Sequence, residues 1–218
     1  MPSSGGHHER EQRMTASFEW GSELPRLSGR RIDLRWIMQQ DAPAIYSIFG
    51  DFEVMRYWSS PPLEDVAGAS ELIESIHRHF ASRNLFQWGI CRRETDEIVG
   101  TCTLLNISLA HRRAEVGIAL GRATWGHGFA TEALEVLIGF AFDTLELHRL
   151  EADVDPENER SLRVLERQGF RREGYLRERW HHLGKLHDTI FMGLLRREWD
   201  VVTFRQPGDR PPSPAGMD

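Results

Sequence analysis

The chain has 218 residues, of which 40% are hydrophobic and 28% are charged, and these proportions suit one globular domain with a sizeable core. The same proportions exclude a chain that is disordered throughout. The formal net charge is −6 at pH 7 and there is no long Lys/Arg tract, which argues against a nucleic-acid partner.

Both ends of the chain lack apolar periodicity. Residues 1–27 are polar and residues 204–218 are rich in Pro and Gly, which predicts flexible tails on either side of one folded domain at residues 28–203. No run approaches the roughly 20 apolar residues that span a bilayer, and the N-terminus lacks the apolar core of a signal peptide. We therefore expect a cytoplasmic protein without a membrane partner.

The first half of the folded region changes its hydrophobic period twice. Apolar residues alternate with polar ones in four segments, as in half-buried strands, and recur at helical spacing in two segments between the first and second of these. Asp41 stands where it can cap the first helix. The predicted elements are a strand at 32–36, helices at 41–50 and 64–83, and strands at 86–90, 98–105 and 114–120, the last three forming an antiparallel meander.

The second half reads as a crossover followed by a hairpin. A one-sided apolar stripe predicts a helix over 130–145, and a strand follows at 150–154. Asn158 can cap the next helix, and Gly169 stands where a left-handed C-cap belongs. Segments 170–180 and 186–195 predict a closing hairpin. The order of elements indicates a mixed α/β (α+β) fold with one parallel crossover.

The chain has two cysteines, Cys91 and Cys102, each within a strand-like run. Two cysteines are too few for a disulfide framework or a cysteine-based zinc site, so both are predicted to be reduced, buried thiols. The histidines form no evident metal-binding pattern. We therefore expect no metal.

Two glycines, Gly126 and Gly128, lie between a predicted strand and a predicted helix. Such a turn points successive amides outward at the positive end of a helix and can cradle a phosphate group. A P-loop is excluded because no Gly-Lys-Ser/Thr follows. A plain tight turn and a dinucleotide fingerprint remain as alternatives; in the second, Asp153 or Asp155 would bind a ribose, but Thr131 occupies the position of the third glycine.

Three segments, at 114–134, 150–161 and 165–174, together resemble the GNAT acetyltransferases, and most closely the branch that acetylates N-terminal alanine of ribosomal proteins. The resemblance covers about residues 30–197. It implies the GNAT fold, a central, mostly antiparallel, twisted sheet of about seven strands flanked by four helices and splayed between the fourth and fifth strands. It also implies acetyl-coenzyme A as co-substrate.

The resemblance assigns the coenzyme site to two stretches of the chain. Pantetheine is expected along the fourth strand, where Gly117 and Gly121 either mark a bulge or weaken the strand. Trp125 stands where the family has Gln or Arg, which leaves backbone amides as the main phosphate donors. The implied coenzyme-binding residues are Ile118, Ala119 and Leu120 on the strand, and Trp125, Gly126, His127, Gly128, Phe129, Ala130 and Thr131 at the loop.

The family's Asn-x-x-Ser pattern matches Asn158 and Ser161, which lie one helical turn apart. The resemblance implies that the asparagine contacts the pantetheine arm and that the serine protonates the coenzyme sulfur, while Asn158 as a plain helix cap stays open. For the general base, Glu115 is preferred and Glu178 is the second candidate. Related enzymes have a carboxylate where Trp180 stands here. His181, His182 and Asp188 are further candidates for the base.

The resemblance implies direct attack of a primary amine on the thioester, without an acyl-enzyme. The expected acceptor is the N-terminus of a protein or peptide, such as a ribosomal protein, and Tyr57 and Trp58 line either the acceptor cleft or the core. Two alternatives stay open. One is a small-molecule acceptor such as a polyamine, an amino acid or an aminoglycoside, and the other is a non-catalytic sensor of acyl-coenzyme A. The chain is expected to be a monomer or homodimer.

Overall fold

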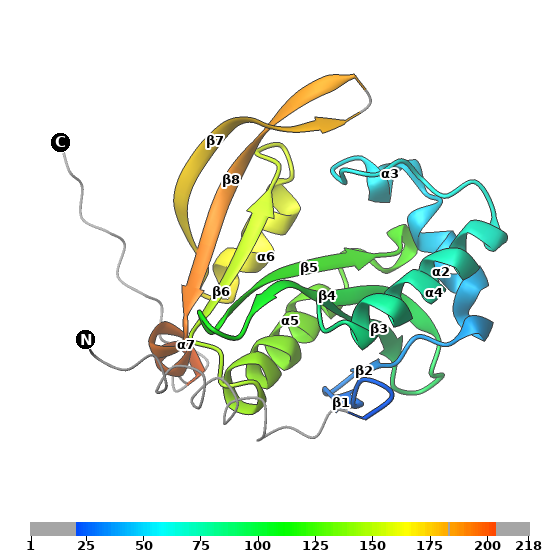
Figure 1. The fold of residues 1–218 in the computed structure, drawn as a ribbon, viewed down its shortest axis with the longest axis horizontal. Coiled ribbons are helices and arrows are strands. Elements are labelled where there is room, and N and C mark those ends of the chain that lie inside the picture. The colour runs from blue at the N-terminus through cyan, green and yellow to red at the C-terminus, as the bar shows by residue number, and fades with distance from the viewer. Residues whose placement is uncertain (1–20, 183, 204–218) are drawn as a thin grey trace, which may run out of the picture.

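A computed structural model describes residues 21–182 and 184–203 of the chain. Its centre is one eight-stranded sheet in the order β1-β2-β3-β4-β5-β6-β8-β7 (Figure 1). All neighbouring strands are antiparallel except β5 and β6. The strands are β1 (Leu27–Ser28), β2 (Ile32–Arg35), β3 (Leu85–Arg92), β4 (Ile98–Ser108), β5 (Arg113–Leu120), β6 (Arg149–Val154), β7 (Arg171–His182) and β8 (Lys185–Leu195).

Helices pack on both faces of the sheet (Figure 1). One apolar cluster joins α5 and α6 to one face, with Trp88, Leu104 and Leu137 at its centre, and a second joins α2 and α4 to the other face around Ile45 and Ile73. The α-helices are α2 (Ala42–Phe49), α3 (Phe52–Met55), α4 (Val66–Ala81), α5 (Phe129–Gly139), α6 (Glu159–Arg167) and α7 (Arg196–Thr203).

The predicted order of strands and helices is confirmed, together with the antiparallel meander and the single parallel crossover β5–α5–β6. Three short elements were not predicted: β1, which makes the sheet eight-stranded instead of seven-stranded, and the helices α3 and α7. The predicted helix over 130–145 is α5 followed by a π-helical turn, Phe140–Thr144. Gly169 has φ +91°, as the predicted left-handed C-cap requires.

The packed structure begins before the predicted domain boundary at residue 28. Leu24 is 4% exposed, and the Trp88 indole Nε1 donates to the Pro25 carbonyl oxygen at 2.9 Å. Residues 21–27, which the sequence assigns to the N-terminal tail, therefore contribute to the core. The rest of that tail (1–20) and the C-terminal tail (204–218) lie outside the described residues.

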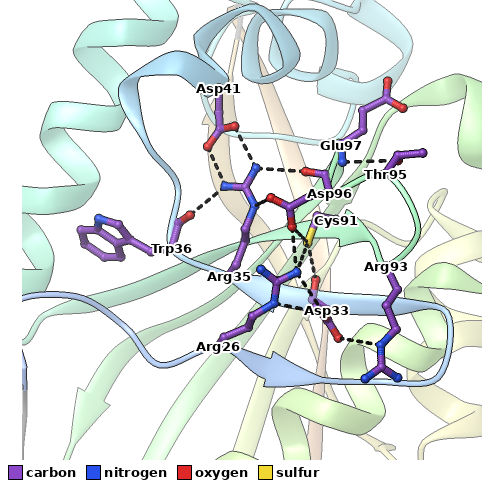
Figure 2. Close-up of polar contacts among 10 residues, drawn as sticks. All are labelled: Arg26, Asp33, Arg35, Trp36, Asp41, Cys91, Arg93, Thr95, Asp96 and Glu97. Carbon is purple, nitrogen blue, oxygen red and sulfur yellow. Dashed lines mark hydrogen bonds and ion pairs between the residues drawn. The ribbon is translucent and has the colours of Figure 1, made fainter.

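A buried ionic network fixes β2 against the β3–β4 turn (Figure 2). Arg35 donates from Nη1 and Nη2 to the two Asp41 carboxylate oxygens at 2.8 and 2.9 Å, and Nη2 also donates to the Asp96 carbonyl at 3.1 Å. Asp41 stands at the N-cap position of α2, as predicted, but its carboxylate accepts from Arg35 and the Met38 amide, and not from α2. A charge pair with several hydrogen bonds is needed to offset the burial of both ions.

Both cysteines are buried free thiols, as predicted. Burial raises the pKa of the Cys91 thiol to about 11, with a further contribution from the charge of Asp96. Burial also raises the pKa of Cys102, so neither is a reactive thiolate at neutral pH. No helix in the described part of the chain is both long and apolar enough to cross a membrane.

Candidate active site

The strands β5 and β6 pair over only three residues each before they separate. Their parallel register joins Arg113–Glu115 to Arg149–Glu151, and no pairing follows. The resemblance to the GNAT family predicts this splay between the fourth and fifth predicted strands, which are β5 and β6. It leaves the end of β5 paired only with β4 among the described strands.

A cavity of about 240 Å³ lies at the splay and is called the inner cavity here. Its walls come from both separated strands, from α6, from the loop after α3 and from the β7–β8 hairpin. Figure 1 shows that hairpin extending beyond the end of β6. Among the lining residues are Tyr57, Trp58, Glu115, Gly117, Ile118, Asp153, Asp155, Asn158, Ser161, Trp180, His187 and Asp188.

A second hollow, called the loop groove here, runs from the inner cavity to the glycine loop. The two share the lining residues Arg56, Tyr57, Trp58, Ile118, Asn158 and Ser161, so they adjoin each other. Most of the predicted coenzyme-binding residues line it. They are Ile118, Ala119, Leu120, Trp125, Gly126, Ala130, Asn158 and Ser161.

The glycine loop has the backbone conformation that its sequence predicts. Gly126 and Gly128 have φ +81° and +79°, a region that residues with a Cβ rarely adopt. Gly128 caps α5, whose first amides have no partner within the helix and are available to an anion. A Cβ on Gly126 would meet no atom within 4 Å, so this glycine is required by its dihedral angle and not by close packing.

The side chains of the loop divide between the groove and the core. Trp125 lines the loop groove, where its Nε1 donates to the Leu120 carbonyl at 2.8 Å and the Arg160 guanidinium lies 4.6 Å from its ring centroid. His127 is exposed and stacks on the buried Phe129 at 5.9 Å. The structure thus does not bring His127, Gly128, Phe129 or Thr131 to the wall of the groove.

Glu132, which the sequence analysis did not single out, holds the start of α5 against β2. Its side chain is 3% exposed, and its Oε1 accepts from the Arg30, Arg31 and Ile32 amides at 2.6, 2.6 and 3.3 Å. Its Oε2 accepts from Arg31 Nε at 3.0 Å. The Arg31 amide and the other donors lower the pKa of the Glu132 carboxyl against the effect of burial. No local pattern signals this role, since the donors are about 100 residues away.

Asn158 and Ser161 lie where β6 leads into α6, and both line both hollows. Asn158 is the N-cap of α6, and its Oδ1 accepts from the Ser161 amide at 3.2 Å. The capping role is therefore present, and it leaves the Asn158 Nδ2 group and the Ser161 hydroxyl as the polar groups that these residues can offer to a ligand.

Glu115 on β5 is half-buried in the wall of the inner cavity, and its Oε2 accepts from Asn106 Nδ2 at 2.9 Å. Burial raises the pKa of the Glu115 carboxyl, and the charges of Asp153 and Glu151 raise it further, against a lowering by the Asn106 hydrogen bond. A carboxylate with a raised pKa is a better proton acceptor than an ordinary surface Glu.

Glu178, the second candidate base, does not line the inner cavity. The β7–β8 register shifts between Leu176 and Trp180, and Glu178 takes φ +53° within this bulge. In a regular strand Glu178 would lie on the same face as Trp180, because residues two apart share a face. The bulge breaks that alternation, so only Trp180 reaches the wall.

The other candidate bases belong to the β7–β8 hairpin. Asp188 accepts from the Tyr175 hydroxyl at 2.5 Å and from the Glu178 amide at 2.7 Å, and these bonds lower the pKa of its carboxyl. A lowered pKa makes Asp188 a weak base. His181 does not line the inner cavity, and the side chain of His182 is outside the described part of the structure.

The strands of the meander and the loop after α3 complete the site. Of the two alternatives for Gly117 and Gly121, the bulge is not found: β5 pairs regularly with β4 from Glu115 to Leu120, and the register shift lies in β4 between Leu105 and Ser108. Tyr57 donates to the Glu157 carbonyl at 3.3 Å, which links the loop after α3 to the start of α6.

Within the described residues no cluster of three or more His, Cys, Asp or Glu side chains could hold a metal.

Comparison with known proteins gives a consistent family. The model of the acetyltransferase (GNAT) domain matches residues 31–171. The uncharacterized N-acetyltransferase p20 of Bacillus licheniformis is 38% identical over 169 residues, which are 78% of this chain and 95% of that protein. YdaF of Bacillus subtilis, provisionally named a ribosomal N-acetyltransferase, is 33% identical over 129 residues, 59% of this chain and 69% of that protein.

Solved structures show the same fold. The spermidine N-acetyltransferase of Vibrio cholerae, crystallised with CoA and spermine, superposes with a TM-score of 0.69 at 25% identity. The match covers 78% of this chain and 98% of that one. The sheet starts with antiparallel strands, unlike a doubly wound dinucleotide-binding fold. This difference and the superposition together argue against the dinucleotide-binding alternative for the glycine loop.

Proposed function

The chain belongs to the GNAT acetyltransferase family, and from this we propose that it moves an acetyl group from acetyl-coenzyme A by direct attack onto a primary amine at the N-terminus of a protein or peptide. The family gives the reaction class and the co-substrate, and the acceptor is the proposed part. The relationship to YdaF supports a protein acceptor. A cytoplasmic location is part of the same proposal.

The observation that carries the proposal is the pair of adjoining hollows that extend from the α5 N-terminus to the splay. The turn at Gly126 and the Ala130 amide, which line the loop groove at the start of α5, can bind the pyrophosphate at one end. The side of β5 that faces away from β4, from Ile118 to Leu120, can pair with the amides of the pantetheine arm. On this proposal the thioester lies beside Glu115 and Ser161, which both line the inner cavity.

Acetyl transfer then needs two proton movements and a donor for the developing oxyanion. An acceptor that enters as an ammonium ion first loses one proton to solvent, which leaves a nitrogen with a lone pair. Glu115 accepts the second proton as that nitrogen bonds to the acetyl carbonyl carbon. Ser161 donates its hydroxyl proton to the sulfur as the carbon–sulfur bond breaks, and regains a proton from solvent. The Asn158 amide remains available to orient the pantetheine arm next to Ser161.

A second acceptor class has its own support. The Vibrio cholerae structure comes from a spermidine N-acetyltransferase, and it is related to this chain over nearly its whole length. The inner cavity also has four carboxylate residues in its walls, Glu115, Asp153, Asp155 and Asp188. A polyamine is therefore the alternative acceptor, and it differs from a peptide in charge and not in the chemistry of the step.

The test is release of free thiol from acetyl-coenzyme A with three acceptors: a peptide beginning with Ala, the same peptide with a blocked N-terminus, and spermidine. The proposal expects turnover with the free peptide, none with the blocked peptide and less with spermidine. Faster turnover with spermidine would favour the polyamine alternative. Binding of acetyl-coenzyme A in calorimetry without thiol release with any amine would instead indicate a sensor and refute the enzyme.

The pH–rate profile tests Glu115 as the base. Because its pKa is raised, the fall in kcat/KM at low pH is expected above the value of about 4.3 for an ordinary Glu. Glu115→Gln should lower the rate and remove this limb, whereas Glu178→Gln should leave it in place. The opposite result for the two variants would transfer the role to Glu178.

A further inference from the structure

A buried carboxylate that the proposed mechanism does not use lies in the wall of the inner cavity. The Asp153 side chain is 8% exposed, and its Oδ1 has no hydrogen-bond partner among the described residues. Three other buried side chains among the described residues also have an atom without a hydrogen bond, Asp33, Arg35 and Thr101, but none of them lines the cavity. A buried carboxylate oxygen without a hydrogen bond is costly, so its position here points to a ligand.

Asp153 lies next to the proposed base. In the parallel register Glu115 of β5 is opposite Glu151 of β6, and Asp153 follows two residues later on the same face. Glu115 and Asp153 therefore face one space from the two strands that splay apart. The charge of Asp153 contributes to the raised pKa of Glu115.

The nearby arginines are engaged mainly elsewhere. Arg113 and Arg149 both donate to the Glu151 carboxylate at 2.7 Å. Arg179, which is half exposed, lies 3.6 Å from Asp153 Oδ2 and 5.6 Å from the Trp180 ring centroid. A single half-exposed ion pair is weak. Arg56, which also lines the inner cavity, lies 3.8 Å from the Glu157 carboxylate. The pair of carboxylates thus has room for a further cation.

We propose that Asp153 and Glu115 together bind the ammonium group of the acceptor, and that this pair selects primary amines with no carboxylate on the carbon that bears the amine. The first part follows from charge: a cation between two partly desolvated carboxylates supplies the missing partner of Asp153. The inference rests on the proposed function, since the amine must reach the acetyl group in the inner cavity.

The selectivity follows from the same pair. A free α-amino acid carries its own carboxylate two bonds from the amine nitrogen, and in the cavity this group would lie close to Asp153 and Glu115. Like charges in a site of low dielectric repel strongly and serve to reject competing ligands. Peptide N-termini and polyamines carry no such carboxylate next to the amine. Both acceptor classes of the proposed function can therefore bind, and free amino acids are rejected.

The test uses L-alaninamide and L-alanine, which differ in this carboxylate alone. In the wild-type chain kcat/KM should favour alaninamide by about tenfold or more. Asp153→Asn should raise the KM for alaninamide about tenfold, reduce the preference over alanine, and leave the KM for acetyl-coenzyme A unchanged. Comparing the preference between the two proteins cancels the different amine pKa values of the two compounds.

Asp143→Asn is the matched control. Asp143 is 67% exposed and pairs with Arg196, away from both hollows. It should change neither KM nor the preference. An unchanged acceptor KM in Asp153→Asn, or an equal rise in the KM of both substrates, would overturn the inference while the acetyltransferase proposal stands. Absence of turnover with every amine would refute the proposed function, and the inference with it.

Thermal unfolding separates binding from a structural role. Because Asp153 Oδ1 is buried without a hydrogen bond, Asp153→Asn loses no hydrogen bond at that atom, and the Tm should stay the same or rise. A residue kept for its ion pair with Arg179 would give the opposite sign. A lower Tm with an unchanged preference for alaninamide would assign Asp153 to folding and refute its contact with the acceptor.

Discussion

The hydrogen bonds from Arg30, Arg31 and Ile32 to the Glu132 carboxylate, called the Glu132 clamp here, predict a large, pH-dependent loss of stability when the carboxylate is replaced. Glu132→Gln keeps one oxygen for the three amides but loses the charge, and its NH₂ group faces the Arg31 Nε–H, another donor. Hydrogen bonds to a charged acceptor contribute about 1 kcal/mol more than those to a neutral one. With two amide bonds at 2.6 Å and the Arg31 bond affected, the expected loss is about 3 kcal/mol.

The assay is urea unfolding of the wild-type chain, Glu132→Gln and Glu135→Gln at neutral and acid pH. Glu135 lies on the same helix, is 51% exposed and contacts Arg30 at 3.5 Å, so its replacement should change the free energy of unfolding by less than about 0.5 kcal/mol. The loss in Glu132→Gln corresponds to a fall in Tm of roughly 6–12 °C.

The pH dependence has a fixed sign. The pKa of Glu132 is lowered in the folded chain, so its contribution is fully present above the unfolded value of about 4.3 and is lost as the pH falls through the lower, folded pKa. The gap between wild type and Glu132→Gln should therefore close in acid. A gap that is below about 1 kcal/mol at neutral pH, or that grows in acid, would refute the clamp.

Three further predictions follow from the geometry. Gly126→Ala, at φ +81°, should lower the free energy of unfolding by about 1 kcal/mol and raise the KM for acetyl-coenzyme A. Gly139→Ala, at φ −55° with no atom within 4 Å of an added Cβ, should leave stability unchanged or increase it. Steady-state kinetics gives the KM, and thermal unfolding gives the Tm of each variant. Arg35→Met should cost about 3–5 kcal/mol in urea unfolding because it leaves Asp41 buried and unpaired, and combining it with Asp41→Leu should recover part of the loss. Ser161→Ala should lower kcat and preserve the acetyl-coenzyme A KM; unchanged turnover would remove its role as acid.

What the sequence predicts well is what depends on neighbours along the chain. The alternation in β3, β4 and β5, the stripe of α5 and the Gly126-x-Gly128 turn are all local patterns, and each is present where expected. Asn158 was found through a local pattern as well, because its capping bond reaches only three residues ahead.

What the sequence does not predict depends on partners distant along the chain. The bulge in β7 that turns Glu178 away is defined by its register against β8, and regular strand alternation gives no sign of it. Glu132 binds amides about 100 residues away. Asp153 was visible as an acidic residue that alternates with the core residues of β6, but its missing partner is a fact of three-dimensional packing.

The separation of β5 from β6 explains why these features gather in one place. Where two strands stop pairing, their backbone N–H and C=O groups need another hydrogen-bond partner. Inside a sheet, a bound ligand can be that partner in place of water. The same separation exposes the alternate residues on both strands, which puts Glu115 on one wall and Asp153 on the other. Closing the sheet would satisfy the backbone but would press two carboxylates together. An acceptor ammonium held between the two walls would contact both carboxylates and relieve their repulsion.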